Sequence, residues 1–247
     1  MSGPRFQGRT AIVTGAGSGI GREITRILLD EGAWVIGADR DTGGVPERAT
    51  PMQADVSSES DVAALVAAAV ARRGRLDIMC NNAGIGSTVD VVECSVEEWD
   101  RVFAVNVRGV FLGCKHAAKQ MLAQDGGGVI VNTASVAGMI GLRDRAAYCA
   151  SKGAVITLTK QVAVQYATRG VRCNCVCPGT VDSPWVGRLL DAAPDAAEAR
   201  RQLVGRQPLG RLGTPAEVAE AVCYLASDAA AFATGTALVL DGGIAAG

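Results

Sequence analysis

The sequence predicts an α/β protein, a Rossmann-type doubly wound parallel sheet of about seven strands with helices on both faces. Three observations carry this prediction. Short apolar runs, often β-branched, recur along the chain. Helical patterns lie between them, and a glycine-rich turn follows the first run. Apolar runs without clean alternation are typical of parallel strands buried on both faces, and alternating strands and helices favour right-handed crossovers.

The apolar runs and the helix starts place the elements along the chain. The predicted strands are Thr10–Val13, Ala33–Ala38, Leu76–Cys80, Val129–Thr133, Val171–Cys177 and Ala237–Leu240. Three pairs have the spacing of capping boxes at helix starts: Ser58 with Asp61, Ser95 with Glu98, and Thr214 with Glu217. No repeat, charge block or linker divides the chain, so we expect one domain over residues 1–247.

The composition excludes several classes of partner. The chain has 247 residues, of which 49% are hydrophobic and 20% charged, and its formal net charge is −1. This balance provides no basic field for nucleic acid or for an anionic membrane surface. No apolar run approaches the roughly 18 residues that a membrane-spanning helix needs.

Cysteine and histidine usage indicates the compartment and the absence of a metal site. The residues after Met1 lack the charged and apolar regions of a signal peptide, so we expect a cytoplasmic protein with reduced thiols. Cys173, Cys175 and Cys177 alternate on one predicted strand and are expected in the core or the wall of a cleft. His116 is the only histidine and has no partners at zinc spacing, so no metal is expected.

The turn Thr14–Gly21 joins the first strand to a helical stretch, Arg22–Glu31. Glycine allows a tight turn and lets backbone N–H groups approach a pyrophosphate, to which the helix N-terminus adds partial positive charge. Between a strand and a helix, this pattern predicts a dinucleotide site. The expected contacts are Gly15, Ser18, Gly19, Ile20 and Gly21.

The end of the second strand predicts NAD rather than NADP. Asp39 lies 18 residues beyond Gly21, close to the place where the dinucleotide pattern has a carboxylate that binds the ribose 2′-hydroxyl. A carboxylate there repels the 2′-phosphate of NADP. Arg40 is the competing signal, because a guanidinium attracts that phosphate, and it is also expected to contact the cofactor.

Six motifs carry a family resemblance: Thr14-Gly-x-x-x-Gly-x-Gly21, Asn81-Asn82-Ala83-Gly84, Asn106, Ser135, Tyr148-x-x-x-Lys152 and Pro178-Gly179. In order and spacing the chain resembles the short-chain dehydrogenase/reductase family, from about residue 7 to the tail Asp241-Gly242-Gly243. The resemblance implies a nicotinamide-dependent oxidoreductase that moves a hydride to or from a carbinol carbon. It also implies a homotetramer, for which the helices beginning near Trp99 and Ala146 offer apolar packing faces.

The resemblance implies four catalytic residues. Tyr148 corresponds to the general acid/base, Ser135 to the serine that hydrogen-bonds the reacting oxygen, and Asn106 to the asparagine that orders a water. Lys152 corresponds to the residue that holds the nicotinamide ribose. Tyr148 and Lys152 are four residues apart and share a helix face, where an ammonium favours the phenolate.

The resemblance also implies further cofactor contacts. Asp55 and Val56 resemble the pair that flanks the adenine, and Asn82 would line the nicotinamide side of the cleft. The segment 178–183 resembles the loop that grips the carboxamide and the pyrophosphate. Its expected contacts are Pro178, Gly179, Val181 and Ser183.

Three arginines stand where the substrate is expected: Arg145, Arg188 and Arg206. The last follows the helical stretch of an expected lid at about residues 183–212. A guanidinium binds a carboxylate through two parallel hydrogen bonds, which suits a small hydroxy or keto acid. Ser135 and Tyr148 complete the expected substrate contacts.

Local sequences around these arginines resemble cytosolic 3-hydroxybutyrate dehydrogenases and 2-keto-3-deoxy-fuconate or -rhamnonate dehydrogenases, so we expect an NAD-dependent dehydrogenase of a small hydroxy or sugar acid. A 3-oxoacyl-thioester reductase is the alternative within the family. A non-catalytic NAD-sensing module is disfavoured, because such a protein needs no proton relay.

Overall fold

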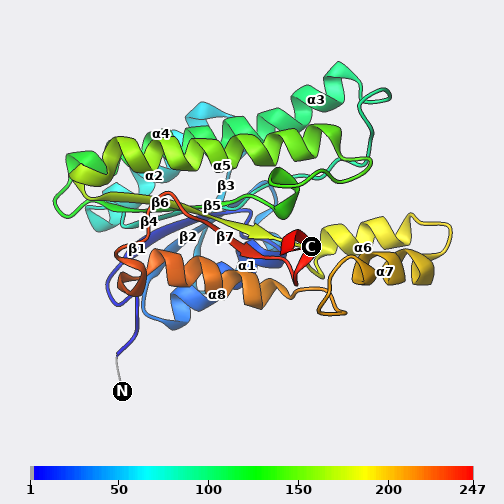
Figure 1. Ribbon diagram of the computed structural model, residues 1–247. Coiled ribbons are helices and arrows are strands. Elements are labelled where there is room, and N and C mark those ends of the chain that lie inside the picture. The colour runs from blue at the N-terminus through cyan, green and yellow to red at the C-terminus, as the bar shows by residue number, and fades with distance from the viewer. Residues whose placement is uncertain (1–2, 247) are drawn as a thin grey trace.

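Seven parallel strands form one sheet in the order β3-β2-β1-β4-β5-β6-β7 in the computed structural model, which describes residues 3–246 (Figure 1). The strands are β1 (Thr10–Thr14), β2 (Trp34–Asp39), β3 (Thr50–Gln53), β4 (Ile78–Asn81), β5 (Gly128–Thr133), β6 (Val171–Pro178) and β7 (Ala237–Leu240). The chain moves outward from β1 to β3 and then returns to β4 on the other side of β1. In open sheets of this kind ligands bind beyond the carboxyl ends of the strands, at this reversal.

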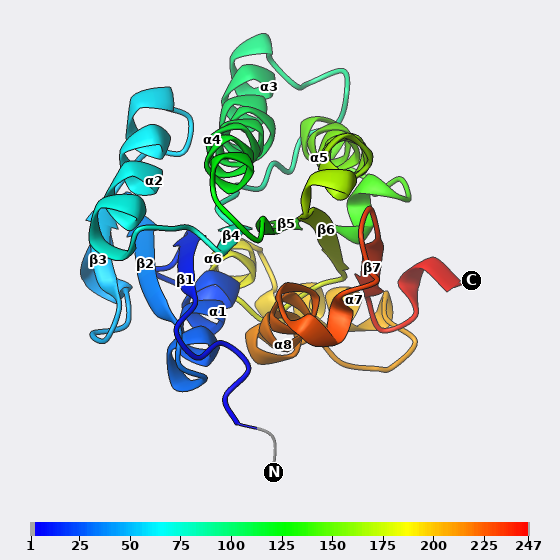
Figure 2. The same cartoon turned by 90° about the vertical axis from the view of Figure 1, so that its left-hand side faces the viewer.

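Helices cover both faces of the sheet, as Figure 2 shows from the end of the strands. One face carries α2 (Glu59–Arg73), α4 (Gly109–Ala123) and α5 (Ala146–Tyr166), and the other carries α1 (Gly19–Asp30) and α8 (Pro215–Ala226). The predicted doubly wound α/β architecture is thereby confirmed. None of the helices within residues 3–246 has the length and apolar character needed to cross a bilayer.

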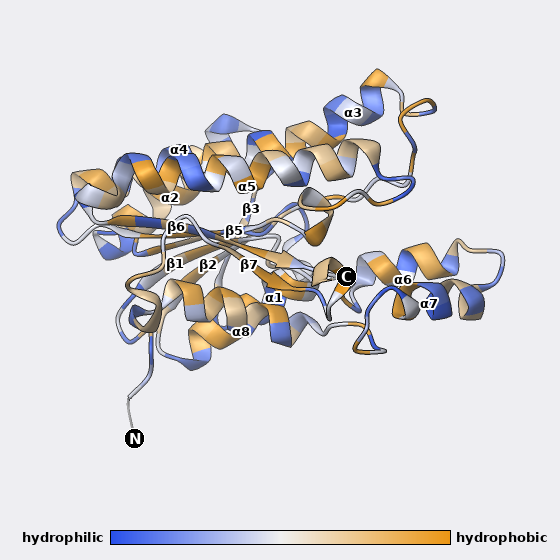
Figure 3. Ribbon diagram, in the orientation of Figure 1, coloured by the Kyte–Doolittle hydropathy of each residue, from blue (hydrophilic) through white to orange (hydrophobic). Residues whose placement is uncertain are grey.

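Each face of the sheet has its own apolar core. Ile12, Met79 and Ile130 point to the side of α2, α4 and α5, whereas Val13, Ile78 and Val131 point to the side of α1 and α8. Successive strand residues face opposite sides, so both faces need apolar residues and the strands read as continuous runs. Figure 3 shows the strands and much of α4, α5 and α8 in hydrophobic colours, with hydrophilic colours on α3 (Val96–Phe103) and α7 (Ala196–Gly205).

Six predicted strands are present, with ends that differ by at most two residues, and β3 is the strand that the apolar pattern did not locate. Its sequence, Thr50-Pro51-Met52-Gln53, contains no apolar run, and three of its four residues are exposed. Such a strand is tolerated because it lies at the sheet edge, where Pro51 does not interrupt a ladder on both sides.

The predicted helix starts are also present. Ser58 and Ser95 accept hydrogen bonds from the backbone N–H three residues on. At α8 the capping box is reciprocal, since Glu217 N donates to Thr214 Oγ1 at 3.2 Å and Thr214 N donates to Glu217 Oε2 at 2.8 Å. Cys173, Cys175 and Cys177 all belong to the core beneath α5, as expected for buried thiols.

Two irregular regions adjoin the carboxyl edge of the sheet. A π-helical turn, Ala104–Arg108, joins α3 to α4 without a break in the helical path. Between β6 and α8 the chain forms α6 (Pro184–Asp191) and α7, which lie beyond the carboxyl ends of the strands (Figure 1). These two helices occupy the segment in which the sequence predicts a lid.

Candidate active site

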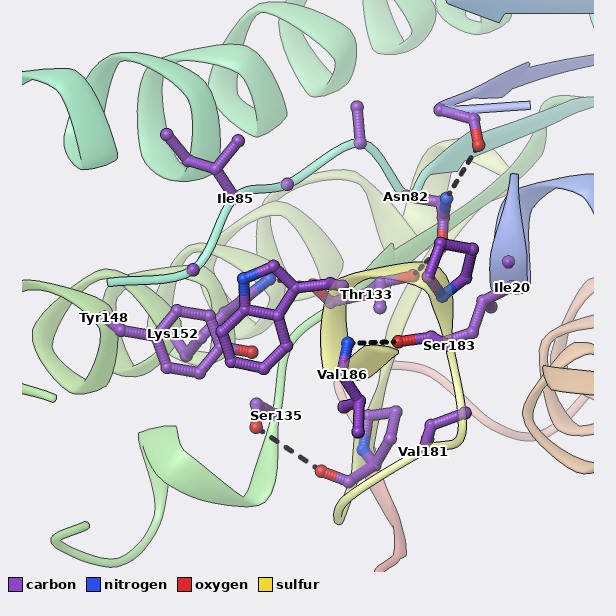
Figure 4. A pocket seen from close by; sticks show the side chains of 18 of the residues that line it. Ile20, Asn82, Ile85, Thr133, Ser135, Tyr148, Lys152, Val181, Ser183 and Val186 are labelled. Atoms are coloured by element: carbon purple, nitrogen blue, oxygen red, sulfur yellow. Dashed lines mark hydrogen bonds between the residues drawn. The ribbon is translucent and has the colours of Figure 1, made fainter. Parts of the chain in front are cut away.

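A cleft of about 730 Å³ lies at the carboxyl edge of the sheet. It is lined by nearly all residues that the sequence assigns to the cofactor, the chemistry or the substrate, although they come from segments throughout the chain. Two assigned residues are not in its wall, Gly21 and Asn106. Figure 4 shows part of this wall, with Tyr148, Lys152 and Ser135 on one side and Asn82 and Ile20 on the other.

The glycine turn fits a pyrophosphate. A Cβ added at Gly21 would lie 2.1 Å from the carbonyl oxygen of Gly15, so Gly21 supports the turn from behind without reaching the cleft. Gly15 has a φ of +69°, which favours glycine. The N-cap Ser18 makes no side-chain bond to the first turn of α1. The free N–H groups of that turn are therefore available to an anion.

Asp39 is held at the end of β2 by backbone donors. Its carboxylate accepts from Gly17 N at 2.9 Å and from Arg40 N at 2.7 Å, and it lines the cleft. The Arg40 side chain is exposed and also lines the cleft. It affects Asp55, whose pKa is lowered first by the Ser57 hydroxyl and to a smaller extent by the Arg40 charge.

Asn82 ties three strand ends together. Its Nδ2 donates to the carbonyl oxygen of Thr14 at 3.1 Å, and its Oδ1 accepts from Thr133 Oγ1 at 3.3 Å. The opposite wall is the 178–183 segment, in which the Ser183 hydroxyl accepts a hydrogen bond from Val186 N at the start of α6 (Figure 4). The expected cofactor residues thus surround one elongated space whose lining fits a dinucleotide.

Tyr148 and Lys152 lie side by side on α5, with Lys152 Nζ 5.7 Å from the centre of the Tyr148 ring. Lys152 Nζ donates to the carbonyl oxygen of Thr133 at 2.8 Å, and burial lowers the pKa of Lys152 to about 8. Burial also raises the pKa of Tyr148, whereas the hydroxyl of Ser135 and the charge of Arg145 lower it. The charge of Arg145 thus favours the phenolate, and Lys152 lies beside the same ring.

Asn106 is fully buried in the π-helical turn, behind the cleft. Its Nδ2 donates to the carbonyl oxygen of Ile85 at 2.9 Å, and its Oδ1 accepts from Ile85 N at 2.8 Å. Nδ2 also donates to Ser151 Oγ at 3.1 Å. These bonds fix the loop that carries Ile85 into the cleft wall, and π-helical turns are frequent at functional sites.

The three predicted substrate arginines line the cleft together and have no acidic partner within residues 3–246. Arg145 is half-buried, and its pKa is lowered first by burial and then by the nearby charge of Arg206. Three other arginines near α6 and α7, outside the cleft, are paired: Arg200 with Asp182, Arg201 with Glu198, and Arg211 with Glu217. The cleft wall thus carries positive charge that no acidic side chain within residues 3–246 pairs.

Sequence reasoning did not assign the apolar part of the wall. It includes Ile85, Leu142, Trp185, Val186, Leu189, Leu203 and Ile244. Among them, Trp185 contacts two assigned residues, since its ring is stacked near Tyr148 with centroids 6.2 Å apart and lies under the Arg145 guanidinium. No local sequence pattern marks these residues, because they meet only when four distant segments come together.

Curated relatives match the chain over nearly its whole length. The 2-(S)-hydroxypropyl-CoM dehydrogenase 3 of Xanthobacter autotrophicus is 42% identical, over 98% of each chain. The cis-4-hydroxycyclohexanecarboxylate dehydrogenase of Sinomonas cyclohexanicum is 42% identical, over 99% of each. The 2-keto-3-deoxy-L-fuconate dehydrogenase of Xanthomonas campestris pv. campestris is 39% identical, over 97% of this chain and 81% of that protein.

The fold and the site define a nicotinamide-dinucleotide oxidoreductase with a tyrosine–lysine pair. A family model described as enoyl-(acyl carrier protein) reductase matches residues 15–245. The structure of the aldohexose dehydrogenase of Thermoplasma acidophilum in ligand-free form superposes with a TM-score of 0.92 at 35% identity, covering 100% of this chain and 97% of that one. The chain belongs to the short-chain dehydrogenase/reductase family, which confirms the resemblance, and is an oxidoreductase of hydroxyl or ketone groups.

The lowered pKa of Lys152 predicts a pH-dependent stability. Between about pH 8 and pH 10 the unfolded chain binds a proton at this lysine that the folded protein does not, so the free energy of unfolding rises with pH. Between about pH 8 and pH 10 we expect the free energy of unfolding of the wild type to rise by about 2 kcal/mol relative to that of the variant Lys152→Met. One pKa unit corresponds to about 1.4 kcal/mol. Urea unfolding at a series of pH values measures the difference. A difference that does not change with pH contradicts a lowered pKa.

Proposed function

We propose that the protein is an NAD-dependent dehydrogenase that oxidises the secondary hydroxyl, or reduces the ketone, of a small hydroxy or sugar acid. The observation that carries the substrate class is the group of arginines without acidic partners beside Tyr148. The proposed working unit is one domain, with α6 and α7 as a lid over the substrate. A panel of hydroxy acids, sugar acids and secondary alcohols with NAD⁺, followed by absorbance of the reduced cofactor, tests the assignment.

The proposed proton transfer belongs to Tyr148. In oxidation its phenolate accepts the hydroxyl proton of the substrate, and in reduction its phenol donates a proton to the carbonyl oxygen. The hydroxyl of Ser135 holds that oxygen by a hydrogen bond. The nicotinamide, when bound, accepts or supplies the hydride. The raised pKa of Tyr148 means that the resting group is the phenol, and positive charge near the ring favours ionisation in the oxidation direction.

Lys152 has the proposed role of holding the nicotinamide ribose. An ammonium has three donors, and Thr133 receives one of them. The other two remain for sugar hydroxyls and lie close to the Tyr148 ring. Asn106 has the proposed role of ordering a water from behind the wall, through the backbone of the loop at Ile85 that it binds.

Asp39 supports NAD as the cofactor. Its carboxylate is fixed by three backbone donors at the end of the cleft, where it can accept bonds from ribose hydroxyls and repel a phosphate. The remaining proposed dinucleotide contacts are Gly15, Ser18, Gly19, Ile20, Gly21, Arg40, Asp55, Val56, Asn82, Pro178, Gly179, Val181 and Ser183.

A carboxylate substrate would neutralise Arg145 and Arg206, whose charges destabilise one another in the free protein. Arg188 lies in the same wall on α6 and is the third proposed contact. The relatives named for a cyclohexanecarboxylate and for a fuconate support this class. The alternative, an acyl-thioester reductase, has the support of the family model's description, but a thioester has no charge near the reacting carbon for these arginines to bind.

We also propose a homotetramer. Exposed apolar residues include Trp99, Phe111 and Val164 on α3–α5, and Tyr224, Phe232 and Val239 near α8 and β7. We assign these two groups to two different contacts between subunits. A closed tetramer with twofold axes needs two different self-complementary surfaces, and the first group includes the helix faces predicted from the sequence.

Removal of the Tyr148 hydroxyl tests the acid/base role. The variant Tyr148→Phe keeps the ring packing but has no transferable proton, so turnover should fall by about a hundredfold or more. NAD⁺ affinity, measured by calorimetry, should stay at the wild-type value. Activity within about tenfold of the wild type contradicts the role.

Replacement of Asp39 tests the cofactor. The variant Asp39→Ala should improve kcat/KM for NADP⁺ by about tenfold or more, because a like charge facing the phosphate is removed. The measurement compares kcat/KM for NADP⁺ and NAD⁺ in both proteins. A wild type that already prefers NADP⁺ would show that Arg40, not Asp39, determines the cofactor preference.

Substitution of the arginines tests the substrate charge. Arg145→Ala and Arg206→Ala should each lower kcat/KM for a hydroxy acid by about tenfold or more, as for one partner of a desolvated ion pair. The neutral methyl ester should lose little, and Arg201→Ala, which is paired on the outside of α7, serves as the matched control. Equal losses for acid and ester would mean that the arginines only shape the pocket.

A charge in the second apolar group tests the assembly. Light scattering should give a tetramer for the wild type and a smaller species for Phe232→Glu. Phe232 is fully exposed in one subunit, so a tetramer that covers this position would have to bury the charge of the new glutamate. A wild type that is monomeric at micromolar concentration refutes the tetramer.

A further inference from the structure

The indole of Trp185 lies between the proposed substrate arginine and the catalytic tyrosine, and the function proposed above gives it no role. Its ring is nearly parallel to that of Tyr148, at an interplanar angle of 15° with centroids 6.2 Å apart. The Arg145 guanidinium carbon lies 5.7 Å from the centre of the indole. Trp185 is the second residue of α6, so the contact joins the lid segment to the N-terminus of α5.

A glycine on the opposite wall makes room for the indole. A Cβ added at Gly86 would lie 2.1 Å from Trp185 Cζ2 and 2.5 Å from Trp185 Nε1. These are side-chain atoms of a rigid ring, so any residue other than glycine would displace it. Gly86 has no positive φ, so the requirement is for space alone, and alanine there is compatible with the local backbone.

Two features of α6 fix the position of the indole. Ser183 caps the helix and Pro184 occupies its first position, which sets the direction in which Trp185 leaves the chain. Arg188 lies three residues later on the same helix face, so placing Trp185 on Gly86 also turns Arg188 toward the cleft, whose wall includes both residues.

We propose that Trp185, seated on Gly86, is a specificity-determining residue that closes α6 over the substrate and holds Arg145 in position for the anionic end. This inference rests on the proposed acid substrate. The Arg145 guanidinium has no acidic partner and is held on one side by a hydrogen bond from its Nη1 to the carbonyl oxygen of Asp144 at 3.1 Å. Its contact with the indole face adds a second restraint on its orientation. A group inserted between two stacked rings needs the rings to be about 7 Å apart. The Tyr148 and Trp185 ring centroids are only 6.2 Å apart, so the substrate cannot enter between them. It must lie beside the Tyr148 ring, with its charged end toward the arginines.

The test compares two glycine-to-alanine variants. Gly86→Ala pushes the indole off its seat, whereas Gly187→Ala, in the same helix as Trp185, adds a methyl group with nothing within 4 Å and is the matched control. Both are made in a protein carrying Trp34→Phe and Trp99→Phe, which leaves Trp185 as the only tryptophan.

The first readout requires no substrate. In Gly86→Ala the emission of Trp185 should shift to longer wavelength and become more accessible to acrylamide, while Gly187→Ala should match the parent protein. Emission and quenching that are identical in all three proteins would overturn the seating on Gly86. This readout is independent of whether the protein oxidises acids.

The second readout is the KM for the hydroxy acid that the substrate panel identifies. Gly86→Ala and Trp185→Ala should each raise it by about fivefold to tenfold, with kcat and the NAD⁺ dissociation constant nearly unchanged and little effect on the neutral methyl ester. Trp185→Phe keeps a smaller aromatic face and should lose less than Trp185→Ala. Equal changes in KM for the acid and the ester would overturn the role toward Arg145. Absence of turnover with every acid would refute the proposed function, while the emission measurement would still report on the seating.

Discussion

The close approach of Asn82 to the ends of β1 and β5 is the contact on which the site depends. Its side chain accepts from Thr133 and donates to the carbonyl oxygen of Thr14. A Cβ at Gly15 or Gly21 would come within 3.0 Å or 2.5 Å of its Nδ2, so the glycine turn folds directly against this amide. Thr133 in turn accepts from Lys152 Nζ at 2.8 Å. A continuous series of contacts therefore sets the turn at a fixed distance from the tyrosine–lysine pair.

Burial dominates the electrostatics at the catalytic end of the cleft. It raises the pKa of Tyr148 and lowers those of Lys152 and Arg145, so each group is shifted toward its neutral form. The mutual repulsion of Arg145 and Arg206 adds to this cost in the free protein. An anion beside them would relieve both the repulsion and part of the desolvation, and charge interactions strengthen where water is excluded. In the proposed function, α6 with its Trp185 would exclude water from this end of the cleft.

Much of the fold and of the site could be predicted from the sequence because the determinants are local. Strands such as Ala237–Leu240 are apolar runs in the sequence. The carboxyl ends of parallel strands necessarily meet at one edge of the sheet. Features set by tertiary contact could not be predicted. The edge strand β3 has no apolar pattern, the side chain of Asn106 faces a backbone loop instead of the cleft, and Trp185 reaches Tyr148 only through the path of α6.

A crystal structure with NAD⁺ and a non-reacting carboxylate analogue of the substrate tests the central claim most directly, since it locates the cofactor and the anion in one measurement. The account predicts carboxylate oxygens within about 3.2 Å of guanidinium nitrogens of Arg145 and Arg206, and the oxygen at the reacting carbon within the same distance of the Tyr148 hydroxyl. A carboxylate bound away from both arginines, with the same oxygen still at Tyr148, would contradict it.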